Sequence, residues 1–354
     1  MITFLVKEWL LAASGMGLIL TSIYRGRLPA FSSDEWQVLF LLFALFIAVE
    51  GLRRSGLIAR IATASERIPH LPVALVLTTF FASMLVTNDA ALVVLVPITL
   101  ALPMRRKDTV VILEALAANG GSALVPFGNP QNLYLYWHYC LSLPEFLGVM
   151  APFSGVSLAF LLLGALAIPR NERAGTAAAE QGPPVDRTAL IYSLFLGLVL
   201  LAVLRLLPAA LVLIILFYGV VFDRSVLRVD YGLLFTLFFF FGLADNLQAL
   251  LFQKIHFSRH VFLFSALVSQ GLSNVPAALL LAPFTSEWKS LLWGTNAGGF
   301  GSLLGSLANL IAYKLYIRQA RPRAAIHFTI KFLVLGYLEF FLAVSLHLLL
   351  HLPA

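Results

Sequence analysis

Two short polar stretches interrupt apolar segments of the chain. LVTNDAALVVLVP (85–97) lies in the first half and GLSNVPAALLLAP (271–283) lies in the second. At matching positions they contain Thr87, Asn88 and Asp89, and Ser273, Asn274 and Val275. Hydroxyl and amide oxygens suit a cation such as Na⁺, and a carboxylate binds a cation or exchanges a proton. Polar groups of these types within apolar sequence therefore predict an ion site.

A second pair of segments is rich in Gly and Asn. NGGSALVPFGNPQNLYLY (119–136) aligns without gaps with NAGGFGSLLGSLANLIAY (296–313), at an offset of 177 residues. Gly permits backbone angles that interrupt a helix, Pro removes a donor, and Asn or Ser caps a new helix. We predict a broken helix in each half, with these further ion-binding candidates: Gly128, Asn129, Pro130, Gln131 and Asn132, and Asn296, Gly305, Ser306 and Asn309.

A third pair of segments completes the internal similarity. EWQVLFLLFALFIAVEGL (35–52) resembles DYGLLFTLFFFFGLADNL (230–247). The pairing matches Glu35 with Asp230 and Glu50 with Asp245. Because three similar blocks occur in the same order in both halves, we predict an internal repeat.

Composition indicates what surrounds these segments. Of the 354 residues, 60% are hydrophobic and 12% charged, and the mean hydropathy is +0.92, which is far from the usage of a soluble domain. We predict an all-α polytopic protein of the lipid bilayer. The net charge of +7 is expected to report orientation and not binding to nucleic acid. The single cysteine, Cys140, excludes an internal disulfide and a multi-cysteine metal site.

Polar and basic segments predict the organisation. The segment 169–187, rich in Ala, Gly, Pro and charge, reads as a cytoplasmic linker. The full assignment is a first membrane repeat over 1–168, with a re-entrant hairpin at about 71–103 and a broken helix at about 109–141; a linking span over 188–206; and a second repeat over 207–354, with a hairpin at about 261–285 and a broken helix at about 288–317.

Basic residues predict the orientation. Clusters at 53–67, 105–107, 170–187, 224–228 and 314–323 are placed in the cytoplasm, with a cytoplasmic N-terminus and an inner-membrane location. Since the first two clusters flank the first hairpin on one side, that hairpin must turn back within the membrane. The second hairpin enters from the other face, so the halves are inverted, with about nine spans and two hairpins.

Breaks in helices at membrane depth indicate a function. Backbone groups exposed there cost several kcal/mol unless protein or a water-filled cavity satisfies them. Helix N-termini suit oxyanions, whereas unwound carbonyls suit Na⁺. We therefore predict a secondary active transporter, and not an enzyme, that carries a small inorganic or organic anion by alternating access. Na⁺ or H⁺ is the coupling ion, and no other cofactor is expected.

The quoted motifs resemble a known family. TNDAALVVLVPITLAL, GNPQN, GLSNVPA and GTNAGGFGSLLGSLAN are similar to those of the ion transporter superfamily, which groups arsenite pump proteins, Na⁺/H⁺ antiporters, citrate carriers and divalent-anion:sodium symporters. The symporter branch has Ser-Asn-Thr at both hairpin tips, where it contacts substrate and helps to form the sodium sites. The resemblance implies Na⁺ sites at Asn88, Asp89, Gly128, Asn274 and Gly305.

This chain departs from Ser-Asn-Thr at both third positions, which are Asp89 and Val275. The first tip, Asn-Asp-Ala, is more similar to the arsenite-pump branch. Beside an anion Asp89 would repel, so it is expected to bind a coupling cation, exchange a proton or accompany a neutral substrate. The alternatives are an arsenite efflux permease, a Na⁺/H⁺ antiporter or a passive ion or solute channel. A purely capping role for Asn88, Asp89 and Asn274 also stays open, as does a homodimer.

Overall fold

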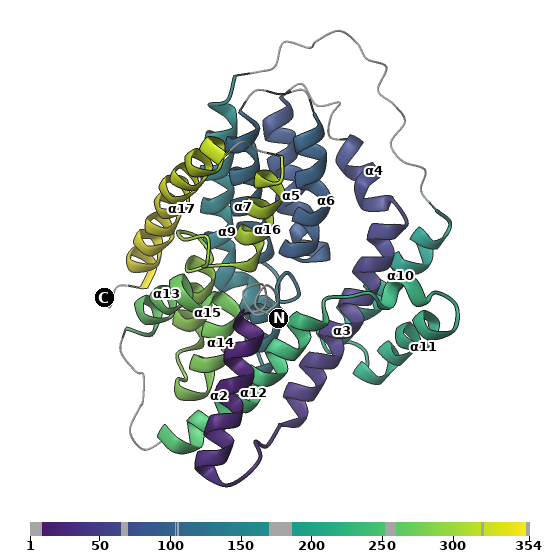
Figure 1. The fold of residues 1–354 in the computed structure, drawn as a ribbon, viewed down its shortest axis with the longest axis vertical. Coiled ribbons are helices and arrows are strands. Elements are labelled where there is room, and N and C mark those ends of the chain that lie inside the picture. Colours follow the sequence, from purple (N-terminus) through teal and green to yellow (C-terminus); the bar gives the residue numbers. More distant parts are fainter. Residues whose placement is uncertain are drawn as a thin grey trace.

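The computed structural model is helical throughout the part that it describes and contains no strand there (Figure 1). The described residues are 9–64, 70–102, 104, 106–169, 186–251, 260–319 and 322–351. This confirms the prediction of an all-α protein with apolar helices. Most of the predicted linker, residues 170–185, lies outside the described part, as do several basic residues used to predict orientation: Arg67, Arg105, Arg170, Arg173, Lys254, Arg259 and Arg321.

The first half contains eight described α-helices. They are α2 (Trp9–Arg25), α3 (Ser33–Arg54), α4 (Leu57–Ala64), α5 (Leu71–Val86), α6 (Asn88–Ala101), α7 (Lys107–Ser122), α8 (Pro130–His138) and α9 (Leu143–Leu166). Two of the long helices begin at a capping box. Ser32 and Ser142 accept the backbone N–H of Glu35 and Glu145, whose side chains accept in return from the cap backbone. These reciprocal bonds satisfy donors that a helix start leaves free.

The second half contains the remaining described helices. They are α10 (Thr188–Val203), η2 (Ala209–Val212), α11 (Leu213–Val221), η3 (Arg224–Leu227), α12 (Tyr231–Leu251), α13 (Val261–Leu272), α14 (Asn274–Leu281), η4 (Ala282–Phe284), α15 (Trp288–Ala297), α16 (Leu307–Ile317) and α17 (Pro322–His351).

Helix length separates full crossings from shorter elements. Within the described residues, four helices are long and apolar enough to cross a bilayer: Ser33–Arg54, Leu143–Leu166, Tyr231–Leu251 and Arg323–Leu350. The segment after α10 forms a 3-10 turn followed by α11. A helix of nine residues rises only about 14 Å, roughly half of the hydrocarbon thickness.

The two helices of each predicted hairpin form a pair that packs closely against the first part of a broken helix. The pair α5–α6 packs on α7, and the pair α13–α14 packs on α15 (Figure 1). A Cβ at Gly121 would lie 2.1 Å from the Phe80 carbonyl oxygen, and one at Gly298 would lie 2.4 Å from the Ser269 Cβ. Only glycine permits this approach, which brings both pairs to the centre of the molecule.

The two halves also pack across each other at the centre. Helix α16 contacts both α6 and α7, and α14 contacts both α8 and α15. Each pair therefore contacts the broken helix of the other half as well as its own. The outer elements α2, α3 and α12 lie on one side of this centre, and α9 and α17 lie on another (Figure 1).

Candidate functional site

The chain turns at a single residue between the helices of each pair. Thr87 has φ 76° and ψ 153°, and Ser273 has φ 73° and ψ 156°. Positive φ is uncommon outside glycine, and unusual for a β-branched residue such as threonine. Such residues cost about 1–3 kcal/mol and occur where the surroundings enforce them, often at ligand sites. Both tips therefore adopt the same costly backbone conformation.

A backbone hydrogen bond ties each tip to the loop of a broken helix. The Asn88 N–H donates to the Gly128 carbonyl at 3.1 Å, and the Asn274 N–H donates to the Gly305 carbonyl at 2.9 Å. Each asparagine side chain then caps its own helix, because its Oδ1 accepts the N–H of Asp89 (2.9 Å) or Val275 (3.0 Å). Both carbonyls that were expected to face Na⁺ thus accept a tip N–H.

Four asparagines join the two broken helices. Asn119 Nδ2 donates to Asn309 Oδ1, and Asn296 Nδ2 donates to Asn132 Oδ1, both at 2.8 Å. The Asn132 amide also donates to the carbonyls of Ser122 and Val125, at 3.3 and 3.4 Å. The Asn309 amide makes the corresponding bonds to other loop carbonyls, those of Gly299 and Ser302, at 2.8 and 3.1 Å. The same bonds recur at the offset of 177 residues found in the sequence.

Asn129 and Ser306 begin the second parts of the broken helices. Asn129 Oδ1 accepts the Asn132 N–H at 2.9 Å, and Ser306 Oγ accepts the Ala308 N–H at 3.3 Å. Each cap also reaches across to the other half, Asn129 to Asn296 at 3.5 Å and Ser306 to Asn119 at 3.0 Å. These side chains satisfy groups exposed by the breaks, so their first role is to hold the centre together.

A cavity of about 190 Å³ opens beside the first tip, and we call it the Asp89 cavity. Three N-termini from the first hairpin and the two broken helices reach it: that of α6 at Thr87 and Asp89, that of α8 at Pro130 and that of α16 at Leu307. Charged side chains also line it: Glu50 and Arg53 from α3, and Arg228 and Asp230 next to α12. The Oδ1 atom of Asp89 is buried and has no hydrogen-bond partner.

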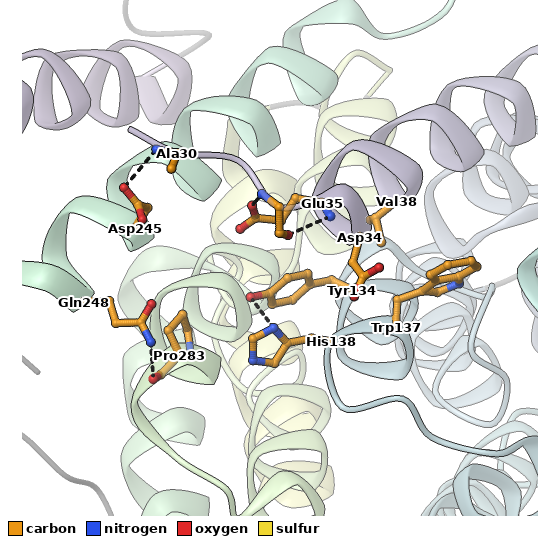
Figure 2. A pocket seen from close by; sticks show the side chains of 11 residues that line it. Ala30, Asp34, Glu35, Val38, Tyr134, Trp137, His138, Asp245, Gln248 and Pro283 are labelled. Carbon is orange, nitrogen blue, oxygen red and sulfur yellow. Dashed lines mark hydrogen bonds between the residues drawn. The ribbon is translucent and has the colours of Figure 1, made fainter. Parts of the chain in front are cut away.

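A second cavity, of about 340 Å³, is the Glu35 cavity (Figure 2). Its lining includes Glu35 from α3, Tyr134 and His138 from α8, and Asp245 from α12. The Tyr134 hydroxyl lies 3.4 Å from His138 Nδ1, and Figure 2 shows both side chains on the floor of the cavity beneath Glu35. Asp245 accepts the Ala30 N–H and pairs with Arg25, both at 3.1 Å.

The two cavities lie at opposite ends of α8, with Pro130 at one and His138 at the other. Glu35 and Glu50, near the two ends of α3, line the Glu35 cavity and the Asp89 cavity, respectively. Asp245 of α12 lines the Glu35 cavity, and Asp230, directly before α12, lines the Asp89 cavity. These four carboxylates are the ones that the sequence alignment pairs. The sequence analysis did not predict that these carboxylates line two cavities. The pairing of Glu35 with Asp230 and of Glu50 with Asp245 was the signal that could have indicated it.

Most of the candidate residues belong either to the Asp89 cavity or to the buried network. Thr87, Asp89 and Pro130 line the Asp89 cavity. The buried network consists of Asn119, Asn129, Asn132, Asn296, Ser306 and Asn309. Asn88 joins it to the first tip through Asn119, and Asn274 bonds to the neighbouring loop carbonyl of Gly305. Ser273 is buried and Val275 partly buried at the second tip. Gln131 is 1% exposed, and neither of its amide atoms has a partner.

Helices long and apolar enough to cross a membrane, with broken helices and buried polar groups between them, are the features expected of a multi-pass membrane transporter. The chain belongs to the citrate transporter family, whose model matches residues 1–289. An uncharacterised transporter of Methanocaldococcus jannaschii is 31% identical over 85% of this chain and 86% of its own length. The inner membrane protein YbiR of Escherichia coli is 33% identical over 79% of this chain and 80% of its own.

A plant relative matches a smaller part. The silicon efflux transporter LSI3 of rice is 32% identical over 38% of this chain and 30% of its own length. The family and the archaeal and rice relatives are named as transporters and not as enzymes, as the sequence predicted.

Proposed function

We propose that the protein is a secondary active transporter of a small anion or oxyanion, with Na⁺ or H⁺ as the coupling ion. Substrate and coupling ion bind together in the Asp89 cavity. The observation that carries this proposal is the meeting of three helix N-termini with one unpartnered carboxylate oxygen. N-termini favour an anion, and the carboxylate favours a cation.

The charges around the Asp89 cavity are compatible with an anion and a cation bound together. Glu50 is bound by Arg53 at 2.6 Å and by Arg54 at 2.8 Å, so its charge is already compensated. Asp89 has no such partner among the described residues. A cation bound at Asp89 would cancel the repulsion that an anionic substrate otherwise meets there. The substrate is then expected to bind well only with its coupling ion, which is the basis of coupled transport.

Two-sided access is supported by the Glu35 cavity at the other end of α8. In transporters with internal repeats, one unit moves between two faces around a central site. Helix α8 runs from one cavity to the other. The bonds of the central asparagine network between the halves are the ones that such a movement would rearrange. The inverted orientation of the halves and the cytoplasmic N-terminus remain predictions from the basic residues.

A second candidate function is the efflux of a neutral hydroxylated species such as undissociated arsenite or a silicon oxyacid. The carboxylate of Asp89 beside the N-termini favours it, because a neutral substrate is not repelled there. The rice relative is named for silicon efflux. In this case Asp89 accepts a hydrogen bond from a hydroxyl of the substrate, or carries a proton in exchange for the substrate.

A ligand screen on purified protein tests both candidates. Thermal stability is measured with Na⁺, Li⁺, citrate, succinate, sulfate, phosphate, arsenite and silicate at two pH values. A ligand at about 100 times its dissociation constant adds roughly 2.7 kcal/mol of stability. We expect an anion to stabilise the wild type and to lose this effect in Asp89→Asn, with Val275→Ala as the matched control. Equal shifts in all three proteins would refute the site.

A further inference from the structure

A buried carboxyl group lies on α17, a helix outside the two hairpins and the two broken helices. Glu339 on α17 is 1% exposed, and its Oε1 accepts a hydrogen bond from the Ser157 hydroxyl of α9. The other oxygen, Oε2, is buried without a partner. A carboxylate buried in this way would be strongly disfavoured without a cation beside it.

The charged side chains of the surrounding elements are engaged elsewhere or lie at their ends. On α17 itself Lys331 pairs with Asp108 of α7, and His347 stacks on Phe262. Glu114 of α7 is bound by Thr99 and Thr79. The charged residues at the element ends are Lys107 on α7, Glu145 on α9, Lys289 on α15, Lys314 on α16, and Arg323 and His327 on α17. None of them forms an ion pair with Glu339 in the described part of the chain. We therefore expect this group to be a neutral acid in this conformation.

A small cavity gives this acid a place for water. Its volume is about 10 Å³, and its walls include Glu339, Ser157, Phe153 and Phe300. A space of this size holds about one water molecule, provided that polar partners line it. The carboxyl and the hydroxyl are the polar groups that it offers, so the missing partner of Oε2 fits a water that accepts or delivers a proton.

The cavity also borders the part of the molecule that the proposed transport cycle would move. Phe300 lies in the loop between α15 and α16, and its ring stacks on Phe153 at 5.7 Å. Gly301 of the same loop touches α17, since a Cβ at Gly336 would lie 2.7 Å from its carbonyl oxygen. Ser157 also packs closely against α7, because a Cβ at Gly120 would lie 2.1 Å from the Ser157 hydroxyl oxygen. Glu339 thus lies between Ser157, which contacts α7, and the loop between α15 and α16.

We propose that the Glu339 carboxyl, held by Ser157, is a proton-binding site of the folded protein that exchanges its proton when the α15–α16 loop moves. On release the O–H bond breaks, its electron pair stays on the carboxylate, and the proton leaves on the cavity water. Ser157 then donates to an ionised oxygen, which strengthens its hydrogen bond. The link to transport rests on the proposed function, whereas proton exchange at Glu339 does not.

Difference infrared spectroscopy of the lipid-reconstituted protein, between acidic and alkaline pH, tests the exchange. The wild type is expected to lose a protonated-carboxyl band as pH rises. That band should be absent in Glu339→Gln and displaced in Ser157→Ala, which keeps the acid but removes its donor. Glu114→Gln, which removes another buried acid, is the matched control and should retain the band. Spectra in which Glu339→Gln matches the wild type would overturn the proposal.

Uptake into proteoliposomes separates this proposal from the proposed function. Citrate, phosphate and arsenite are offered across a range of pH. We expect Glu339→Gln to transport with a flattened pH profile and Glu114→Gln to keep that of the wild type. If none of the probes is taken up but the Glu339 band titrates, the proton site stands and the anion function fails. If uptake occurs and Glu339→Gln keeps the wild-type profile, the link between Glu339 and transport is refuted.

Discussion

The two hairpin tips share a backbone but differ in chemistry. Thr87 and Ser273 have nearly the same φ and ψ, and each following asparagine donates to the loop of a broken helix. One residue later the first tip has Asp89 and the second has Val275. The repeated backbone builds the helix termini, whereas only one half carries the charge. The shared backbone therefore does not depend on a charge at the third position of the tip, so the scaffold and the proposed ion site can be altered separately.

A second contrast lies three residues before each tip. Gln270 on α13 donates to the carbonyls of Gly298 and Phe300, at 2.9 and 3.1 Å, and accepts the Ser302 N–H at 2.8 Å. The matching residue of the first half is Met84, which offers no such bonds. Gln270 therefore adds side-chain bonds between the second hairpin and the α15–α16 loop that Met84 cannot make in the first half, whereas Asn88 of the first tip donates to Asn119 at 3.2 Å.

The largest expected effect comes from breaking the shared scaffold. A Cβ at Gly128 would lie 2.3 Å from the Ser122 carbonyl oxygen, and one at Gly305 would lie 2.4 Å from the Gly298 carbonyl oxygen. We expect Gly128→Ala and Gly305→Ala each to lower the free energy of unfolding by about 1–3 kcal/mol or more, because backbone atoms cannot yield. Gly148→Ala, with open space at its Cβ, is the control in thermal melts. Equal melting of all three variants would contradict the shared geometry.

The next effect concerns the difference in charge. Asp89→Asn keeps the shape of the tip but removes the charge that we propose to bind the coupling cation. Losing a hydrogen bond to a charged group costs about 1.5–3 kcal/mol, or roughly ten- to a hundredfold in affinity for the coupling ion. Val275→Asn, at the uncharged tip, should leave ion dependence unchanged. Uptake at varied Na⁺ and pH measures this, and similar losses in both variants would refute the asymmetry.

A smaller effect is expected from exchanging the residue types at Gln270 and Met84. Gln270→Met leaves buried loop groups unpaired, which costs about 1–3 kcal/mol. Met84→Gln adds an amide to the first half, where no matching set of bonds awaits it, and should not raise stability. Thermal unfolding of both variants provides the test. A gain from Met84→Gln equal to the loss from Gln270→Met would show that the two tips are held alike.

The smallest effect compares ion pairs at the two cavities. Arg54 pairs with Glu50 on the same helix and is partly exposed, so Arg54→Ala should cost less than about 0.5 kcal/mol. Arg25 pairs with Asp245 of another helix and its side chain is 9% exposed. It also donates to Asn246 at 2.7 Å, so Arg25→Ala should cost more. Denaturation at low and high salt distinguishes them, and an equal loss would contradict this ranking.

Much of this architecture could be predicted from local sequence. Apolar composition predicted an all-α membrane protein, and the spacing of Gly and Asn marked where helices break. Pairing across the molecule could not be predicted in the same way. The bonds of Asn119 to Asn309 and of Asn296 to Asn132 depend on how the broken helices cross, and residue types alone do not fix a crossing. Likewise, Glu339 gave no signal, because its burial depends on α9 and the α15–α16 loop.

The central claim is that one cavity binds an anion and its coupling cation together, through Asp89. The most direct test is the affinity of purified protein for a stabilising anion, measured by calorimetry with and without Na⁺ and at two pH values. Since linkage is reciprocal, the account predicts that Na⁺ or H⁺ tightens anion binding in the wild type and in Val275→Asn but not in Asp89→Asn. The same cation dependence in Asp89→Asn as in the wild type would contradict it.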